Sequence, residues 1–173
     1  MNREVERFIT SLDTKKMSVL EISGSRFRDR WPFHSYTTVQ YPDYDVCSGP
    51  LAVAEFDLVI AEQVFEHILH PDLGVRSVYQ MLKPGGIFII DTPFLLKFHP
   101  YPRDLYRWTE DGMRTLLEGA GFSAIETGSW GNRRCLIKDL TPGLGWTSYQ
   151  PLLHSLKNEP QFPIVVWAFA HKE

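Results

Sequence analysis

Polar side chains with acid–base chemistry follow one of the apolar runs of this chain. Glu66 and His67 come shortly after residues 56–61, and a histidine there can gain or lose a proton near neutral pH. The alternative is structural, because a histidine at the end of a short helix can simply cap backbone carbonyls. His67 indicates either a proton-transfer group or a helix end, and the residues alone leave both open.

A longer polar and aromatic loop follows the apolar run at residues 87–91. Its side chains include Lys97, His99, Tyr101, Arg103, Asp104, Tyr106, Arg107 and Trp108. Loops carry binding residues more often than the elements that they connect. Rings beside cations and a histidine suit a polar, anionic or sugar-like acceptor. The alternative is a surface loop that Tyr106 and Trp108 anchor against the core.

Small residues mark the turn after the first apolar run. Residues 17–22 include Glu21, and Ser23, Gly24 and Ser25 follow. Side chains this small let the backbone approach a ligand, and the amides that follow can face an anion. The Glu21 carboxylate could instead meet a cation. A turn that serves only packing is the alternative.

The next strand-like run, residues 36–40, also ends in polar groups. A sugar diol calls for a hydrogen-bond acceptor at such a strand end, and Gln40 could supply an amide there. Asp43 or Asp45 could supply a carboxylate. For Asp43 an ordinary turn-forming role beside Pro42 is the favoured interpretation.

The elements that position these residues alternate between two hydrophobic periodicities. Helical spacing predicts helices over 2–13, 73–82 and 109–120, with shorter ones over 26–31 and 62–68. Apolar runs predict strands over 17–22, 36–40, 56–61, 87–91, 122–127 and 163–170, with a turn at 83–86. This alternation predicts an α/β fold with a doubly wound, mostly parallel sheet. Ligands of such sheets bind at the carboxyl ends of the strands.

Length and charge set the domain organisation and limit the partners. The 173 residues suit one domain, which we expect to span 1–173, with 131–161 as an insertion that covers an acceptor or forms an interface. The net charge of −3 gives no case for a nucleic-acid partner, because such proteins gather excess Lys and Arg. No apolar run approaches the ~20 residues that span a bilayer, so we expect no membrane partner.

Cysteine usage and the N-terminal residues bear on the compartment. Cys47 and Cys135 make neither a disulfide framework nor a metal-ligand motif, so we expect no metal site. Residues 1–16 lack the apolar core of a signal peptide. A reducing cytoplasm is the expected location.

Two segments, taken in order, resemble the class I S-adenosylmethionine-dependent methyltransferases, in particular small bacterial ones of methyltransferase type 11. They are residues 56–68, FDLVIAEQVFEHI, and residues 82–90, LKPGGIFII. The resemblance covers about residues 17–130. It implies a Rossmann-like, seven-stranded sheet whose last strand, 163–170, is antiparallel. It also implies S-adenosylmethionine as cofactor over the ends of the first three strands.

The resemblance assigns cofactor contacts by position. Glu21, Ser23, Gly24 and Ser25 match the turn that holds the methionine end, Gln40 or Tyr41 the ribose site, Asp45 and Val46 the adenine site, and Ala61, Glu62 and Gln63 the sulfonium side. The family usually has glycine where Ser23 and Ser25 stand. The stretch from Glu21 to Asp57 is also short, which predicts a sheet abbreviated between its second and third strands and a more open cofactor site.

Methyl transfer from a sulfonium needs mainly alignment of donor and acceptor, but a hydroxyl acceptor also needs a base. We hypothesise that His67 or His99 is that base, with Asp104 as a second candidate. Tyr106, Arg107 and Trp130 are expected to shape the acceptor pocket. Arg133 lies where the family builds acceptor covers.

The sequence therefore predicts methyl transfer to O or N of a small-molecule or glycan-type acceptor. The alternative is a degenerate relative that is non-catalytic or catalyses a non-methylating reaction such as a cyclisation. The insertion at 131–161 could also serve a homodimer.

Overall fold

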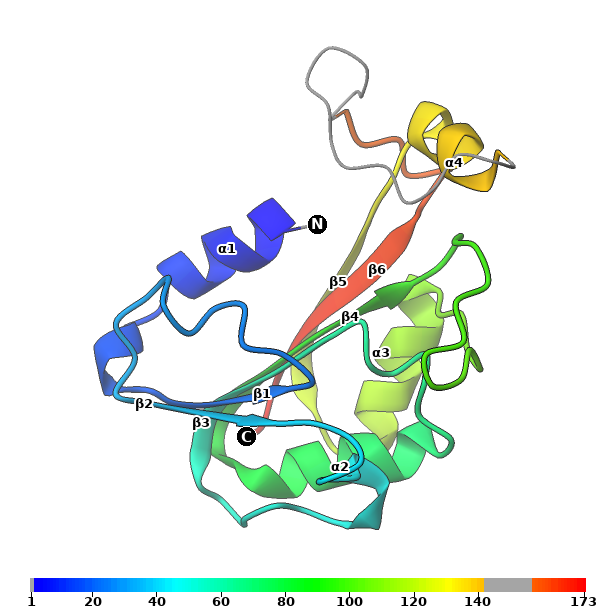
Figure 1. Ribbon diagram of the computed structural model, residues 1–173. Helices are drawn as coiled ribbons and strands as arrows, with labels where there is room; N and C mark the ends of the chain where they lie inside the picture. Colours follow the sequence, from blue (N-terminus) through cyan, green and yellow to red (C-terminus); the bar gives the residue numbers. More distant parts are fainter. Residues whose placement is uncertain (1, 142–156) are drawn as a thin grey trace.

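The computed structural model describes residues 2–141 and 157–173 of the chain (Figure 1). Its strands are β1 (Ser18–Ile22), β2 (Ser35–Val39), β3 (Phe56–Glu62), β4 (Leu82–Pro93), β5 (Ser123–Trp130) and β6 (Val165–His171). Its helices are α1 (Asn2–Thr10), α2 (Pro71–Met81), α3 (Glu110–Gly119) and α4 (Arg133–Leu140), and two 3-10 turns are η1 (Thr14–Lys16) and η2 (Val46–Ser48). None of the helices in this part of the chain is long and apolar enough to cross a bilayer.

One sheet with the strand order β2-β1-β3-β4-β6-β5 organises the fold. The first four strands in this order are parallel, whereas β6 runs antiparallel to both β4 and β5. The doubly wound α/β fold and its antiparallel last strand are thus confirmed. The expected count of seven strands is wrong for the described residues, which form six. Only η2 lies between β2 and β3, so the predicted abbreviation is confirmed.

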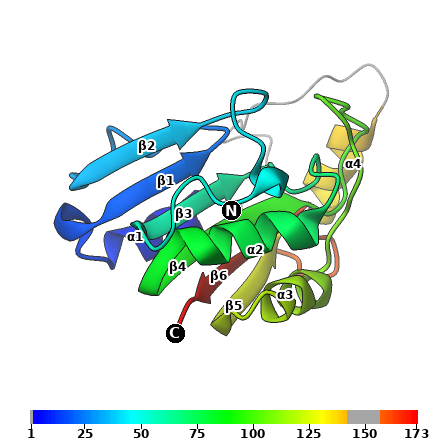
Figure 2. The same ribbon diagram turned by 90° about the horizontal axis from the view of Figure 1, so that it is seen from below.

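Alternating side chains of the strands build a core on each face of the sheet. Leu58 and Ile60 of β3 pack with Val5 and Ile9 of α1. Their neighbour Val59 belongs to the core on the other face, which α2 and α3 cover. Successive residues of a strand point to opposite faces, which explains the division. Figures 1 and 2 show α1 on one side of the sheet and α2 and α3 on the other.

Three local predictions were wrong, each because a tertiary contact replaced the local pattern. Residues 26–31 form turns rather than a helix, since the Glu21 carboxylate accepts hydrogen bonds from their first two amides. Residues 62–68 also form no helix, because Gln63 bonds across to Asp91 and adopts a φ of 53°. Residues 83–86 belong to β4 instead of a turn, and the Gly85 amide donates to the carbonyl of Lys172.

The predicted insertion at 131–161 contains α4. Its residues 142–156 lie outside the described residues, so its role as a cover or interface stays a prediction.

Candidate active site

The carboxyl ends of β1, β2 and β3 lie side by side, as the parallel register requires. Ile22 pairs with Val39 of β2 and with Ala61 of β3. This places the three groups of predicted cofactor residues along one edge of the sheet. A cavity of about 520 Å³ opens there, lined by Gly24, Ser25, Arg28, Thr38, Val39, Gln40, Asp43, Tyr44 and Leu51. Its volume lies within the roughly 300–1,000 Å³ of small-molecule sites.

In the turn after β1, Ser23 adopts a left-handed conformation and Gly24 lies against the side chain of Glu21. Ser23 has a φ of 61°, and its amide donates to the Val39 carbonyl across 2.7 Å. A left-handed conformation costs a non-glycine residue roughly 1–2 kcal/mol. Gly24 meets a different need, because a Cβ there would lie 2.3 Å from Glu21 Oε1. The one glycine of the turn thus makes room for the Glu21 carboxylate.

Glu21 is buried and bound by the chain itself. Its carboxylate accepts hydrogen bonds from the amides of Arg26 (3.0 Å) and Phe27 (3.5 Å) and from the hydroxyl of Tyr36. Burial, together with this bond to Glu21, raises the pKa of Tyr36. Glu21 therefore stabilises the turn, and a cofactor group would have to share its oxygens.

The residues after β2 divide into two groups. Gln40 lines the cavity, as its predicted ribose contact requires. Tyr41 is exposed and Val46 is buried in the core. Asp45 caps η2, because its Oδ1 accepts from the amide of Cys47 at 2.9 Å. Tyr41, Asp45 and Val46 are absent from the cavity lining, so their predicted cofactor contacts stay predictions.

Beyond β3 the edge of the sheet is acidic. Gln63 bridges to the end of β4, where its amide donates to the Asp91 carbonyl (3.0 Å) and its Nε2 donates to Asp91 Oδ1 (2.6 Å). Glu62 forms an ion pair with Arg26, at 3.4 Å between Oε2 and Nη1. Ala61 is buried. Within the described residues, Glu62 Oε1 and Asp91 Oδ2 are buried without a hydrogen-bond partner.

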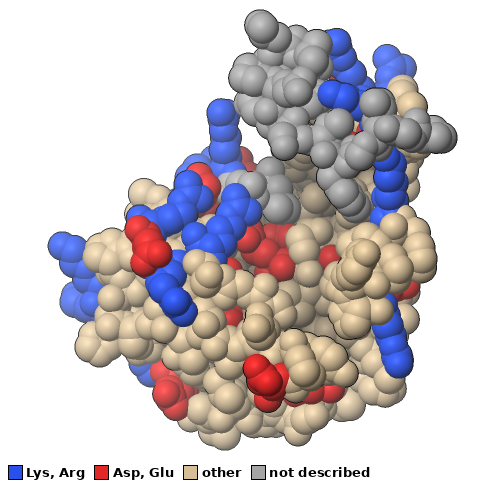
Figure 3. Space-filling view, viewed as in Figure 1, with Lys and Arg blue, Asp and Glu red and all other residues tan. Residues whose placement is uncertain are grey.

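Burial dominates the electrostatics of this acidic pair. It raises the pKa of Asp91 to about 8, and the nearby charge of Glu62 adds to the shift. Burial also raises the pKa of Glu62, and the charge of Arg26 opposes that shift. Figure 3 shows acidic side chains gathered in a recess on this face of the molecule. Such a recess favours a positively charged ligand group.

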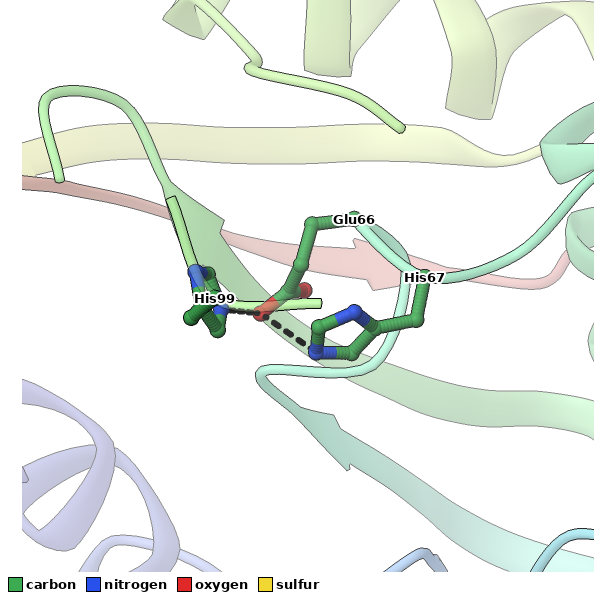
Figure 4. Close-up of side chains that lie close together, drawn as sticks. All are labelled: Glu66, His67 and His99. Atoms are coloured by element: carbon green, nitrogen blue, oxygen red, sulfur yellow. Dashed lines mark ion pairs between the residues drawn. The ribbon is translucent and has the colours of Figure 1, made fainter. Parts of the chain in front are cut away.

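Two histidines face a third carboxylate farther along the same edge (Figure 4). Nε2 of His67 and Nε2 of His99 each lie 3.6 Å from Oε1 of Glu66. The two imidazole rings meet edge to face, with their centroids 5.1 Å apart. Glu66 is fully buried, and burial raises the pKa of its carboxyl group. The structure thus brings together two of the predicted bases, which come from different loops.

The third predicted base is bound in a different way. Asp104 Oδ2 accepts from Arg107 Nη2 at 2.7 Å and from the amide of His99 at 3.0 Å, and Oδ1 accepts from Arg107 Nη1. The bonds from Arg107 lower the pKa of Asp104 to about 2. Such a carboxylate is a weak base, so the geometry favours Asp104 as a group that positions the His99 loop.

The predicted acceptor residues are spread along the edge. Tyr106 packs near Trp108, and its hydroxyl donates to the Leu69 carbonyl at 3.1 Å. Arg107 is engaged with Asp104. Trp130 ends β5 and pairs with Val165 of β6, which also pairs with the last residue of β4. Arg133 is exposed at the start of α4. Their contact with an acceptor stays a prediction.

Comparison with known proteins supplies the family. Residues 4–90 match the model of a family described as methyltransferase domain, which is half of the chain. The chain belongs to this family. Class I S-adenosylmethionine-dependent methyltransferases with the same Rossmann-like fold are its structural neighbours, which agrees with the resemblance seen in the sequence.

Two curated methyltransferases are similar to parts of this chain. A "probable S-adenosylmethionine-dependent methyltransferase" of Mycolicibacterium smegmatis is 31% identical over 104 residues, covering 54% of this chain and 40% of that protein. The mitochondrial ubiquinone biosynthesis O-methyltransferase of Mus musculus is 45% identical over 53 residues, covering 28% and 14%. The match thus spans less than half the length of either relative.

A solved structure extends the likeness over the whole fold. A methyltransferase of Thermotoga maritima, named a "possible histamine N-methyltransferase", superposes with a TM-score of 0.65 at 14% identity. The superposition covers 98% of this chain and 88% of that one. At this identity the likeness concerns the fold alone.

The residues present fit the family's cofactor, S-adenosylmethionine. The molecule carries a sulfonium and an ammonium, and the edge beyond β3 offers buried carboxylate oxygens of Glu62 and Asp91 that no described residue binds. The adjacent cavity could take the adenosine, with Gln40 and Asp43 as polar contacts. When bound, S-adenosylmethionine supplies an activated methyl group.

Sequence reasoning missed two functional candidates, Glu66 and Asp91. Both are acids next to strand ends, but neither was predicted to have a catalytic or binding role. Asp91 follows four apolar residues of β4, and an acid that ends a buried strand is a signal that could have found it. Glu66 precedes His67, yet nothing local showed that its side chain would be fully buried.

Proposed function

We propose that this chain catalyses S-adenosylmethionine-dependent methyl transfer to a hydroxyl oxygen of a small-molecule or glycan-type acceptor. Methylation at nitrogen is the second candidate. The observation that carries the proposal is the cluster of Glu66, His67 and His99, which lies on the same edge of the sheet as the cavity and the acidic recess.

The geometry of the cluster favours an oxygen acceptor. A neutral hydroxyl is a poor nucleophile and must lose its proton as its oxygen is methylated, so a base contributes to the rate. Nε2 of His67 and Nε2 of His99 both face the buried Glu66 carboxylate, which would stabilise either imidazole once it has taken up that proton. A neutral amine acceptor can attack before it loses a proton, so it has less need of such a cluster.

The other residues of the site would bind the methyl donor or hold His99 in place. Glu62 would attract the cationic part of the donor, which once bound would favour the ionised form of Asp91 as well. Gln40 would contact the ribose. Asp104 holds the backbone of His99 through an accepted hydrogen bond of 3.0 Å. The ubiquinone biosynthesis O-methyltransferase among the relatives supports an oxygen acceptor for this chain as well.

The test is transfer of an isotope-labelled methyl group to a panel of hydroxyl and amine acceptors, with S-adenosylhomocysteine and the methylated product measured by mass spectrometry. We expect hydroxyl acceptors to be methylated. The double variant His67→Gln with His99→Gln should lower kcat/KM by about 10²–10⁴-fold, with little change in S-adenosylhomocysteine affinity.

His34→Gln is the matched control, because His34 is an exposed histidine just before β2. Full activity of the double variant would contradict the base assignment. Failure of the parent chain to bind S-adenosylhomocysteine in calorimetry would instead favour a non-catalytic relative. Binding without any methylated product would favour a non-methylating reaction such as a cyclisation.

A further inference from the structure

We propose that Glu66, His67 and His99 form a binding site for a divalent transition-metal ion, for which Zn²⁺ is the best match. One oxygen of Glu66 and the Nε2 atoms of both histidines would be the ligands. One ligand atom from each of the three residues can be chosen so that all lie within 4.8 Å of one another. Figure 4 shows both rings directed at the Glu66 carboxylate.

The other ring nitrogen of each histidine supports this assignment. Nδ1 of His67 lies against the carbonyl of Arg103, and Nδ1 of His99 lies 3.2 Å from the carbonyl of Lys97. A carbonyl oxygen only accepts hydrogen bonds, so each neutral imidazole carries its proton on Nδ1 and a lone pair on Nε2. Metal-bound histidines are typically held in this way, with the second nitrogen donating to a carbonyl or carboxylate.

The carboxylate points to a cation as well. Glu66 has no exposed surface, and within the described residues neither of its oxygens accepts a hydrogen bond. A buried carboxylate that accepts no hydrogen bond is costly unless it is protonated, pairs with a charged group or coordinates a cation. Here the carboxylate lies 3.6 Å from Nε2 of each histidine, and the three residues could hold one ion between them.

The two spacings between the carboxylate and the imidazoles fit a small ion. Ligand atoms at ~2.1 Å from a tetrahedral Zn²⁺ lie ~3.4 Å apart, and each Nε2 of the cluster is 3.6 Å from Glu66 Oε1. Two imidazoles with one carboxylate suit Zn²⁺ and related transition metals better than Mg²⁺ or Ca²⁺, which prefer oxygen ligands. Three protein ligands leave a fourth position open, as in catalytic zinc sites.

The open position gives the ion a role that rests on the proposed function. An acceptor hydroxyl bound there would lose its proton to water more readily, because a zinc ion lowers the pKa of a bound oxygen. The ion would then take the lone pairs of both imidazoles and replace them as the group that activates the acceptor. Metal binding itself needs neither S-adenosylmethionine nor an acceptor.

The test is metal binding by the full chain after treatment with EDTA and removal of the chelator. Calorimetry with ZnCl₂ should give one ion per chain, and CoCl₂ should give the visible absorption of four-coordinate Co²⁺. We expect Glu66→Gln and His99→Gln each to weaken Zn²⁺ binding by at least about tenfold. Zn²⁺ should also raise the Tm of the parent chain, because it binds the folded state.

Controls make the outcome specific. His34→Gln should bind Zn²⁺ as the parent does. A variant with a native far-ultraviolet spectrum but no Tm increase on adding Zn²⁺ supports the site even if its stability has changed. Parent-like binding by both ligand variants, or no binding of Zn²⁺ or Co²⁺ to the parent, would overturn the proposal.

The two proposals fail in different ways. Zinc binding without methyl transfer would remove the proposed function and keep the metal site. Full methyl transfer in EDTA by a chain that binds no zinc would remove the metal site and leave the histidines as the base.

Discussion

Glu21 and Glu66 are both buried carboxylates near the carboxyl ends of parallel strands, yet they are treated in opposite ways. Glu21 accepts hydrogen bonds from two backbone amides and the Tyr36 hydroxyl. Glu66 accepts none from the described residues and faces two histidine nitrogens instead. Both were reasonable candidates for ligand contact from their position next to a strand.

The difference distinguishes a carboxylate that stabilises the fold from one that is available to a ligand. Buried polar groups in proteins are nearly always hydrogen-bonded, so an unpaired one requires an explanation. Glu21 is explained by the turn that it stabilises. For Glu66, and for the oxygens of Glu62 and Asp91 that have no hydrogen-bond partner among the described residues, the metal ion and the cofactor proposed above would supply the explanation.

The largest expected effect concerns Asp91, whose pKa is raised to about 8 mainly by burial. The unfolded chain releases this proton near pH 4, about its ordinary value. Between these pH values the folded chain holds more protons, so the free energy of unfolding should fall as the pH rises, by up to about 1.4 kcal/mol per pH unit.

Urea unfolding at several pH values measures this slope, and Asp91→Asn should flatten it. The matched control is Asp29→Asn, at an exposed position after β1, which should keep the parental slope. An unchanged slope in Asp91→Asn would contradict the raised pKa of Asp91.

The second largest expected effect concerns Glu21, the carboxylate that the chain itself hydrogen-bonds. Glu21→Gln keeps the shape of the side chain but replaces one acceptor oxygen with an amide that cannot accept. One of the three donors to Glu21 then loses its partner in a buried site. We expect the free energy of unfolding to fall by about 1–3 kcal/mol, measured by urea unfolding at pH 7. A neutral result would mean that Glu21 is free to serve a ligand.

The smallest expected effect concerns Glu66, which is tested with the same change from Glu to Gln. Glu66→Gln in metal-free buffer removes a buried acidic group that has no hydrogen-bond partner among the described residues. We expect the free energy of unfolding to stay unchanged or rise by up to about 1 kcal/mol. A decrease in the free energy of unfolding as large as that of Glu21→Gln would show that Glu66 also stabilises the fold. The two carboxylates would then not differ in role.

Much of the fold was predictable because strand patterns are strongly local. Every predicted strand is present within a few residues. The inner strands β1, β3, β4 and β6 are apolar runs that are mostly buried on both faces of the sheet, whereas the edge strands β2 and β5 are only partly buried. The helices α1, α2 and α3 were predictable from their apolar stripes. The predicted helix at 62–68 failed because Gln63 bonds across to Asp91, a contact with no local signature.

The site was predictable only in part, for the same reason. The carboxyl ends of parallel strands lie along one edge of the sheet, so the residues around Gly24 and Gln40 could be assigned to one cavity. The pairing of His67 with His99 could not, because the two come from different loops. The route of the His99 loop depends on amides of Leu105 and Tyr106 that donate to the Glu66 carbonyl.

By itself the sequence determined the α/β class, the strand ends that carry polar groups and the methyltransferase family. Those properties reside in local periodicity and in short motifs such as residues 56–68. Only the tertiary structure decided which carboxylates are satisfied. A hydrogen bond needs a partner within about 3 Å. Whether Glu21 has one, and Glu66 has none among the described residues, depends on how distant segments pack around each side chain.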